Sequence, residues 1–305
     1  MTKGRDMKTQ KKQNSTNCGR NHIPPSVSLV EKHYNCDDLT EKITKALADS
    51  GKKLSDLKPR DLAPVDQLHT GGAKATIELI NRTGLEPDTM VLDAGCGTGG
   101  SSRLLAEHFR LRVTGIDLSY QFIRAAQFLT RCTNLENRIC FRQGSVLCLP
   151  FEDLSFDAVL CQHMLMNIED KHGAINEFYR VLKPGGRLIL HEITRGTGQK
   201  PAFPVPWAAS PCTSFLEPWQ EILSIISRYG FTAVFHEDKT MSALEWWKKA
   251  ESVSRKKIPG PGRTSMGPGI VFGENAKFFA RNMRANFQQN SICLIEAMFK
   301  KSYDG

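Results

Sequence analysis

The sequence predicts an α/β fold in which helices cover both faces of one doubly wound, mostly parallel sheet. Short apolar segments alternate with amphipathic segments between about residue 90 and residue 193. A glycine-rich turn follows the first apolar segment, and an aspartate lies at the end of the second. Repeated strand–helix–strand units of this kind build parallel sheets with right-handed crossovers. We therefore expect one sheet-centred domain with loop and helix additions.

Strands are expected where short apolar runs lie between turn signals, and helices where apolar residues recur every three or four positions. The predicted strands are residues 90–94, 112–118, 139–144, 156–162, 186–193, 232–236 and 291–299. The predicted helices are residues 37–50, 73–83, 101–109, 120–131, 172–182, 219–229, 242–254 and 274–287. Asp37 or Asp38 is a candidate amino-terminal cap for the first helix.

The chain divides into three parts by composition. Residues 1–36 are predicted to be a basic disordered tail, because they are polar and cannot bury enough apolar surface to offset ordering. Residues 37–72 are expected to form an entry segment or lid. Residues 73–305 form the main domain, with insertions at 194–216 and 240–290 that should complete the lid, since long loops in compact domains are usually functional or disordered.

Charge and cysteine usage narrow the class of protein. The formal net charge is +9, of which residues 1–22 contribute +5 through six basic residues and Asp6. This concentration indicates a solvated tail, so a nucleic-acid partner is not expected. Nine cysteines without a C-x-x-C pair predict neither a disulfide framework nor a metal site. The absence of any apolar run of about 18 residues, and of a signal-like start, predicts a cytoplasmic protein without a membrane span.

The glycine-rich turn is compatible with two kinds of cofactor. Gly95, Gly97 and Gly100 have dinucleotide spacing, and Asp117 follows about 20 residues later, where NAD enzymes bind the ribose. Asp93, however, places negative charge beside the turn, where it would repel a pyrophosphate and suit an ammonium group. Glycines at 95, 97 and 99 allow close backbone approach to a ligand. The residues favour a cofactor with a cationic end.

Four segments carry a resemblance to a known family: VLDAGCGTG at 91–99, VTGIDLS at 113–119, LPFEDLSFDAV at 149–159 and RVLKPGGRL at 180–188. They resemble the successive motifs of class I S-adenosylmethionine-dependent methyltransferases over about residues 60–240. The segments at 66–72 and 203–208 resemble the sarcosine and dimethylglycine methyltransferase-like branch. The resemblance implies S-adenosylmethionine as cofactor and a seven-stranded Rossmann-like sheet whose last strand is antiparallel.

We expect the cofactor to contact the glycine turn, the end of the second strand, the segment after the third strand and the end of the fourth. These residues are Asp93, Gly95, Gly97, Thr98, Gly99, Asp117, Leu118, Ser145, Val146 and Gln162. The resemblance places Ser145 and Val146 beside the adenine. Many relatives have an aspartate where Ser145 stands, so cofactor affinity is expected to be weaker than usual.

Sites in doubly wound folds open at the carboxyl ends of the strands, which places His163 within reach of an acceptor. His163 is the leading candidate base, with His69 as a second. A structural role for either histidine stays open. Gln67, His69 and Trp207 are candidate acceptor-binding residues, since the resemblance places their segments over the site and Trp207 could contact a cationic group.

The resemblance leaves three functions open. The two branch-like segments favour methyl transfer to an amine nitrogen of a small molecule such as glycine, sarcosine or dimethylglycine. Ubiquinone and menaquinone methyltransferases share the core motifs, so carbon or oxygen methylation of a quinol or other lipid-like acceptor is the alternative, favoured if the pocket lacks anion-binding residues. An RNA-associated cofactor-binding protein is a third possibility. The oligomeric state does not follow from the sequence.

Overall fold

The computed structural model describes residues 25–34, 36–256 and 266–302, with side chains up to residue 252 in the second range. Its strands form one sheet of order β3-β2-β1-β4-β5-β7-β6, in which β7 runs antiparallel to β5 and β6. The strands are β1 (Met90–Ala94), β2 (Arg112–Asp117), β3 (Ile139–Gln143), β4 (Phe156–Gln162), β5 (Leu182–Arg195), β6 (Phe231–Asp238) and β7 (Ile292–Lys301). The predicted fold class, including the antiparallel last strand, is confirmed.

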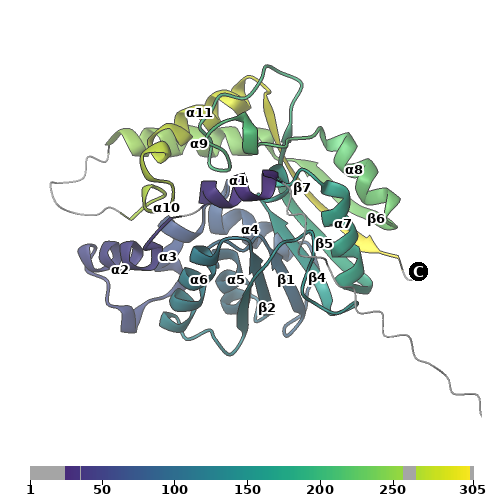
Figure 1. Ribbon diagram of the computed structural model, residues 1–305, viewed down its shortest axis with the longest axis horizontal. Helices are drawn as coiled ribbons and strands as arrows, with labels where there is room; N and C mark the ends of the chain where they lie inside the picture. Colours follow the sequence, from purple (N-terminus) through teal and green to yellow (C-terminus); the bar gives the residue numbers. More distant parts are fainter. Residues whose placement is uncertain (1–24, 35, 257–265, 303–305) are drawn as a thin grey trace, which may run out of the picture.

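Helices cover both faces of this sheet and extend beyond it (Figure 1). The α-helices are α1 (Pro25–Tyr34), α2 (Leu39–Asp49), α3 (Pro59–Asp66), α4 (Gly72–Asn81), α5 (Gly100–His108), α6 (Tyr120–Cys132), α7 (Lys171–Val181), α8 (Trp219–Arg228), α9 (Thr240–Lys256), α10 (Gly269–Phe272) and α11 (Ala276–Gln288). Short 3₁₀ turns are η1 (Leu54–Asp56), η2 (Leu165–Asn167), η3 (Pro211–Thr213) and η4 (Gly273–Asn275). No helix in these described ranges is long and apolar enough to cross a bilayer.

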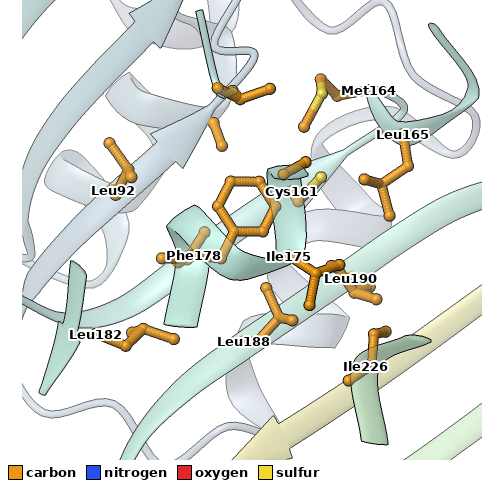
Figure 2. Close-up of a cluster of buried hydrophobic side chains, with 14 of the residues drawn as sticks. Leu92, Cys161, Met164, Leu165, Ile175, Phe178, Leu182, Leu188, Leu190 and Ile226 are labelled. Carbon is orange, nitrogen blue, oxygen red and sulfur yellow. The ribbon is translucent and has the colours of Figure 1, made fainter. Parts of the chain in front are cut away.

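The central strands are apolar on both faces because helices bury both. Successive residues of a strand point to opposite sides of the sheet. Val91 therefore packs in the cluster beneath α4 and α5, while its neighbour Leu92 packs against α7 and α8. Figure 2 shows Leu92 and Leu190 gathered with Ile175 near the ring of Phe178. This double burial explains why β1, β4 and β5 appear in the sequence as continuous apolar runs.

The loop after β5 and the helices α9 and α11 form a separate apolar layer. Figure 1 shows α9 and α11 side by side at the top of the view, and these two helices pack closely along their lengths. Their buried side chains, among them Met283 and Phe287, share one cluster with Trp207 from the loop after β5. The insertions predicted at 194–216 and 240–290 are thus folded together, which fixes the position of Trp207 over the strand ends.

The predicted disordered tail is too long, because residues 25–34 form helix α1. Val30 is buried, and the Tyr34 hydroxyl donates a 2.8 Å hydrogen bond to the Asn167 side-chain oxygen. Val27, Val30 and Tyr34 recur at helical spacing, and this periodicity was masked by the polar residues around it. The rest of the predicted tail up to residue 24 lies outside the described residues.

The entry segment also differs from its prediction. Helix α3 is not among the predicted helices, and Pro59 stands at its first position, where a missing N–H costs nothing. Asp38 takes a left-handed backbone conformation and makes no side-chain capping bond, so the predicted cap at that residue is wrong. Helix α2 packs on α6 through Leu39, Ile43 and their neighbours, so it braces the domain instead of covering the site.

Strand five begins earlier than its apolar residues suggest. It starts at Leu182, which pairs with Phe156 before a register shift, and runs to Arg195. The Lys-Pro-Gly-Gly segment lies at the register shift, between the pairs Phe156–Leu182 and Ala158–Arg187. At its other end the strand continues beyond its last pair with β4, at His191, and stays paired with β7 as far as Arg195.

A buried ion pair joins the entry segment to the glycine turn. The Arg103 side chain on α5 donates a 2.8 Å hydrogen bond to Asp66 Oδ2 and a 2.7 Å bond to the Thr98 carbonyl. Both charged side chains are almost fully buried. A single guanidinium therefore holds the end of α3, the turn after β1 and the body of α5 together.

We predict that Asp66→Asn lowers the free energy of unfolding by about 3–5 kcal/mol, because it leaves the Arg103 charge buried without its partner. Denaturant-induced unfolding at neutral pH measures this loss. The matched control is Glu78→Gln, which breaks an exposed pair with Lys74 on α4 and should cost under about 0.5 kcal/mol. Equal, small losses in both variants would contradict the prediction.

Candidate active site

A cavity of about 180 Å³ opens at the carboxyl ends of β1, β2 and β4. This is the edge at which doubly wound folds bind their ligands. Most of the site residues predicted from the sequence line it: Asp93, Gly95, Gly97, Thr98, Asp117, Leu118, Ser145, Val146, Gln162, His163, His69 and Trp207. The cavity therefore brings together residues from the glycine turn, the entry segment and the loop after β5.

The glycine turn has the backbone shape that its sequence predicts. Gly95 and Gly97 have backbone φ angles of 77° and 54°, which residues other than glycine rarely adopt. A Cβ atom on Gly95 would lie 2.5 Å from Met164 Cγ. Glycine at this position leaves the backbone open to the cavity, so a ligand can approach the turn closely.

Asp117 closes the turn from the end of β2. Its two carboxylate oxygens accept 2.9 Å hydrogen bonds from the backbone N–H groups of Gly97 and Ser119. Burial raises the pKa of Asp117 to about 6, and these backbone bonds oppose the rise. The carboxylate keeps lone pairs free for donors in the cavity, as a ribose diol would supply.

Asp93 is the second carboxylate of the site. Its Oδ2 accepts a 2.6 Å hydrogen bond from the Ser102 hydroxyl on α5. Burial raises its pKa to about 6, and the nearby charge of Asp117 adds to the rise. Two buried carboxyls with raised pKa values in one cavity are stabilised in their charged form by a cationic ligand.

Gln162 is held in place by its neighbours at the end of β4. Its side-chain oxygen accepts from the Ser101 hydroxyl at 2.8 Å, and its amide nitrogen donates to the Thr76 hydroxyl at 3.2 Å. The His69 Nε2 atom lies 2.9 Å from the Thr76 hydroxyl and 3.0 Å from the Gly72 carbonyl oxygen. Because a carbonyl only accepts, Nε2 carries the ring proton and Nδ1 is left as the basic nitrogen.

His163 has an unusual conformation directly after β4. Its φ is 50°, in the left-handed region, and its buried Nε2 has no hydrogen-bonding partner in the protein. Burial lowers the pKa of His163 well below its ordinary value, and the nearby His191 and His69 lower it further. Burial also lowers the pKa of His69, to about 4. Both histidines are therefore neutral near pH 7.

Two predicted site residues do not line the cavity. Gln67 ends α3, and its side-chain oxygen is buried without a partner. Gly99 begins α5 with a φ of 84°, and a Cβ there would lie 2.8 Å from the Phe141 ring, so it serves the packing of the turn. The cofactor-binding role predicted for Gly99 and the acceptor-binding role predicted for Gln67 stay predictions, and sequence adjacency alone does not fix which side of a turn faces a ligand.

Several lining residues were not predicted. Helix α1 contributes Val27, Val30 and Tyr34, and the segment after β4 contributes Met166 and Asn167. The Asn167 amide donates to the Trp207 carbonyl at 2.8 Å, which ties this segment to the loop after β5. The signal for α1 was the helical spacing of its apolar residues. Nothing in the sequence around Asn167 indicated its bridging role.

The wall of the cavity combines acidic, uncharged polar and apolar side chains. Its formally charged lining residues are Glu31, Asp66, Asp93 and Asp117, and none of the described lining residues is lysine or arginine. Apart from the glycine turn and its aspartates, aromatic and aliphatic side chains such as Phe122, Met166 and Phe272 dominate. Within the described ranges, no group of three or more His, Cys, Asp or Glu residues has an arrangement that could hold a metal ion.

Comparison with known proteins agrees with this geometry. Residues 92–190 match the family model described as a methyltransferase domain. Phosphoethanolamine N-methyltransferase 1 of Arabidopsis thaliana is 31% identical over 180 residues, which are 59% of this chain and 36% of the plant protein. The chain thus spans little more than a third of that relative's length.

Two solved structures share the fold. The [4+2]-cyclase SpnF superposes with a TM-score of 0.66 at 21% identity, covering 92% of this chain and 98% of the cyclase. A putative sarcosine dimethylglycine methyltransferase from Galdieria sulphuraria superposes with a TM-score of 0.62 at 16% identity, covering 88% and 99% of the two chains. At these identities the likeness shows the fold alone.

The sheet order, the glycine turn and the aspartate that ends β2 define an α/β protein with a nucleoside-binding edge. The match over residues 92–190 makes the class more specific. Within residues 92–190 the chain matches a methyltransferase domain, in agreement with the class I, S-adenosylmethionine-dependent motifs that its sequence resembles.

We predict that S-adenosylmethionine binds more weakly as the pH falls through about 6. Both Asp93 and Asp117 have pKa values raised to about 6, so below that pH they bind protons and lose the charge that a cationic ligand requires. Asp117→Asn should weaken binding tenfold or more at neutral pH, since a bond to a charged acceptor contributes about 1.5–3 kcal/mol. Isothermal titration calorimetry at several pH values measures both effects.

The control for this prediction is Glu107→Gln, which removes an exposed carboxylate on α5 and should leave affinity and its pH dependence unchanged. A dissociation constant that stays flat between about pH 5 and 8 in the unmutated protein would be incompatible with charged carboxylates acting in binding.

Proposed function

We propose that this chain is an S-adenosylmethionine-dependent methyltransferase that acts on an apolar small-molecule acceptor. The observation that carries the proposal is the pair of carboxylates that line the cavity at the glycine turn, the buried Asp93 and the half-buried Asp117. Asp117 would hold the ribose hydroxyls, Ser145 and Val146 would border the adenine, and Asp93 with Gln162 would hold the methionine end. The matched domain model supports this assignment.

When bound, the cofactor supplies a methyl group by in-line displacement from its sulfonium, so the protein's main task is to position the acceptor. Helix α1 and the loop after β5 meet over the cavity through the Tyr34–Asn167 and Asn167–Trp207 hydrogen bonds. These contacts exclude water from the strand ends. His163 is neutral and its Nε2 has no hydrogen-bonding partner in the protein, so this side chain can receive a proton from the acceptor.

The polarity of the cavity indicates what the acceptor lacks. A phosphate or carboxylate buried without a cationic partner would cost several kcal/mol. No lysine or arginine occurs among the described lining residues, whereas the part of the wall beyond the glycine turn is rich in apolar side chains. We therefore favour an uncharged, largely apolar acceptor over glycine, sarcosine or a phosphorylated amine such as the substrate that names the plant relative.

The alternatives carry less support. An amino-acid amine fits the branch resemblance but would place its carboxylate among acidic residues. A dinucleotide would bring a pyrophosphate against Asp93. The hypothesis of an RNA-associated protein depends on basic residues that lie outside the described residues. It therefore rests on the sequence alone.

We expect labelled methyl transfer from S-adenosylmethionine to a quinol, phenol or isoprenoid-like acceptor, and little transfer to sarcosine or phosphoethanolamine. The apolar wall binds the first group, and its acidic residues repel the anions of the second. Scintillation counting of extracted products, confirmed by mass spectrometry, measures the transfer.

Calorimetry with S-adenosylmethionine and with NAD, run on the same protein, separates cofactor binding from acceptor choice. Preferential methylation of sarcosine or phosphoethanolamine would overturn the acceptor proposal, and NAD binding without S-adenosylmethionine binding would overturn the whole assignment.

A further inference from the structure

A row of polar residues crosses the buried sheet at one level. The strand register pairs Gln162 on β4 with His191 on β5, His191 with Glu296 on β7, and Glu296 with Glu237 on β6. Directly paired residues point to the same face of a sheet. His191 and Glu296 are 1% and 4% exposed, so this row lies within the core although apolar residues precede it on each central strand.

Three histidines meet where this row reaches the cavity. The His163 and His191 rings lie 5.1 Å apart between centroids, and the His69 ring lies 5.7 Å from His191 and 6.0 Å from His163. His69 and His163 line the cavity, whereas His191 lies behind them. The His69 ring meets the other two rings edge to face, and the His163 and His191 rings are tilted by 46°, so a rotation about χ2, a broad torsion in histidine, changes which ring atoms face each other.

His69 Nε2 has polar partners, but other nitrogen atoms in this cluster have no hydrogen bond, which is costly in a core. His163 Nε2 and both ring nitrogens of His191 are buried without a well-formed hydrogen bond to the protein. Buried polar groups are nearly always paired, so unpaired ones call for a functional explanation. The left-handed backbone of His163 is a second local cost at the same place.

The row leads outward to charged residues at the surface. His191 Nδ1 lies 3.5 Å from Glu296 Oε1. The other carboxylate oxygen of Glu296 lies 3.6 Å from Arg82 Nη1 and 3.8 Å from Lys239 Nζ. Arg82 and Lys239 are 38% and 26% exposed in their side chains, so Glu296 connects the buried ring to solvent.

We propose that His163, His191 and Glu296 form a relay that carries a proton from the methyl acceptor to solvent beside Arg82 and Lys239. This inference rests on the proposed function and adds a role for two residues that do not line the cavity. His163 is the group that faces the acceptor. His191 and Glu296 act through it, as positioning and conducting residues.

Methyl transfer releases one proton from the acceptor, and the relay carries that proton to water. An acceptor with an O–H, N–H or activated C–H bond gains a methyl group as the carbon–sulfur bond breaks, and the sulfur keeps that electron pair. The acceptor's own bond to hydrogen breaks, its electrons stay on the acceptor, and the proton passes to a His163 nitrogen. His163 then gives a proton to one ring nitrogen of His191, which releases one from its other nitrogen, Nδ1, to the Glu296 carboxylate, and the carboxylate returns it to water.

Neutral rings suit this task. Burial lowers the pKa of His191 well below its ordinary value, and the neighbouring His69 and Lys239 lower it further. A backbone interaction with Thr70 raises the pKa and so opposes these effects. Burial raises the pKa of Glu296, while Lys239 and Arg82 oppose the rise and Glu237 and Glu78 add to it. A lasting positive charge on either ring is therefore unfavourable, so proton uptake at one ring nitrogen has to be coupled to proton release from the other.

The kinetic test uses His191→Gln and Glu296→Gln, neither of which lines the cavity. The acceptor is the one that receives the labelled methyl group fastest in the transfer assay described above. With this acceptor, the single-turnover rate of each variant near neutral pH should be about tenfold or more below that of the unmutated protein. The affinity for S-adenosylmethionine should stay within twofold. The loss should shrink as the pH rises toward about 9, because hydroxide can then take the proton. The control, Thr194→Val, removes a fully buried and unpaired hydroxyl on the same strand and should leave rate and pH profile unchanged.

A second measurement needs neither cofactor nor acceptor. Nuclear magnetic resonance of protein labelled with ¹⁵N-histidine follows exchange of the His163 ring proton with water. A relay predicts about tenfold slower exchange in His191→Gln and Glu296→Gln than in the unmutated protein and in Thr194→Val. Absence of methyl transfer by the unmutated protein would refute the proposed function only. Equal exchange rates in all four proteins, or equal turnover at every pH, would overturn the relay.

Discussion

The buried pair of Arg103 and Asp66 is the contact on which the site depends. Arg103 also binds the Thr98 carbonyl, the Ala126 carbonyl and the Thr130 hydroxyl, so one side chain connects α3, the glycine turn, α5 and α6. A buried ion pair adds little net stability compared with apolar packing, but its removal is costly. Its value here is geometric, since it fixes where the entry segment meets the cofactor edge. Asp66 itself lines the cavity, next to His69.

The site combines a rigid half with an assembled half. Strand ends and the helix after the glycine turn hold Asp93, Asp117 and Gln162, each with hydrogen bonds from neighbouring groups. The other half comes from α1, the segment after β4 and the loop after β5, joined through Asn167. The rigid half is suited to holding a cofactor, and the assembled half to surrounding an acceptor.

The charges that line the cavity favour a different class of methyl acceptor from the small amines that the sequence resemblance favours. The branch-like segments at 66–72 and 203–208 do contribute His69 and Trp207 to the wall, as their resemblance implied. Resemblance in a loop does not specify the charge of the surrounding surface, however, and here the described wall contains acids and apolar groups without a basic partner. The polar row behind the wall, from Gln162 through His191 to Glu296, suggests that proton removal is handled inside the sheet.

The sequence by itself indicated the strands, the glycine turn and the carboxylates of the cofactor edge, because these features depend on residues close in the chain. Strand periodicity, positive φ at Gly95 and Gly97, and the aspartate that ends β2 are all local features. Only the tertiary structure decided that α1 covers the cavity, that Gln67 and Gly99 do not line it, and that His191 lies behind His163. Those facts depend on strand register and on contacts between residues more than a hundred positions apart, such as Tyr34 with Asn167. A single sequence records the residues of such pairs but not their pairing.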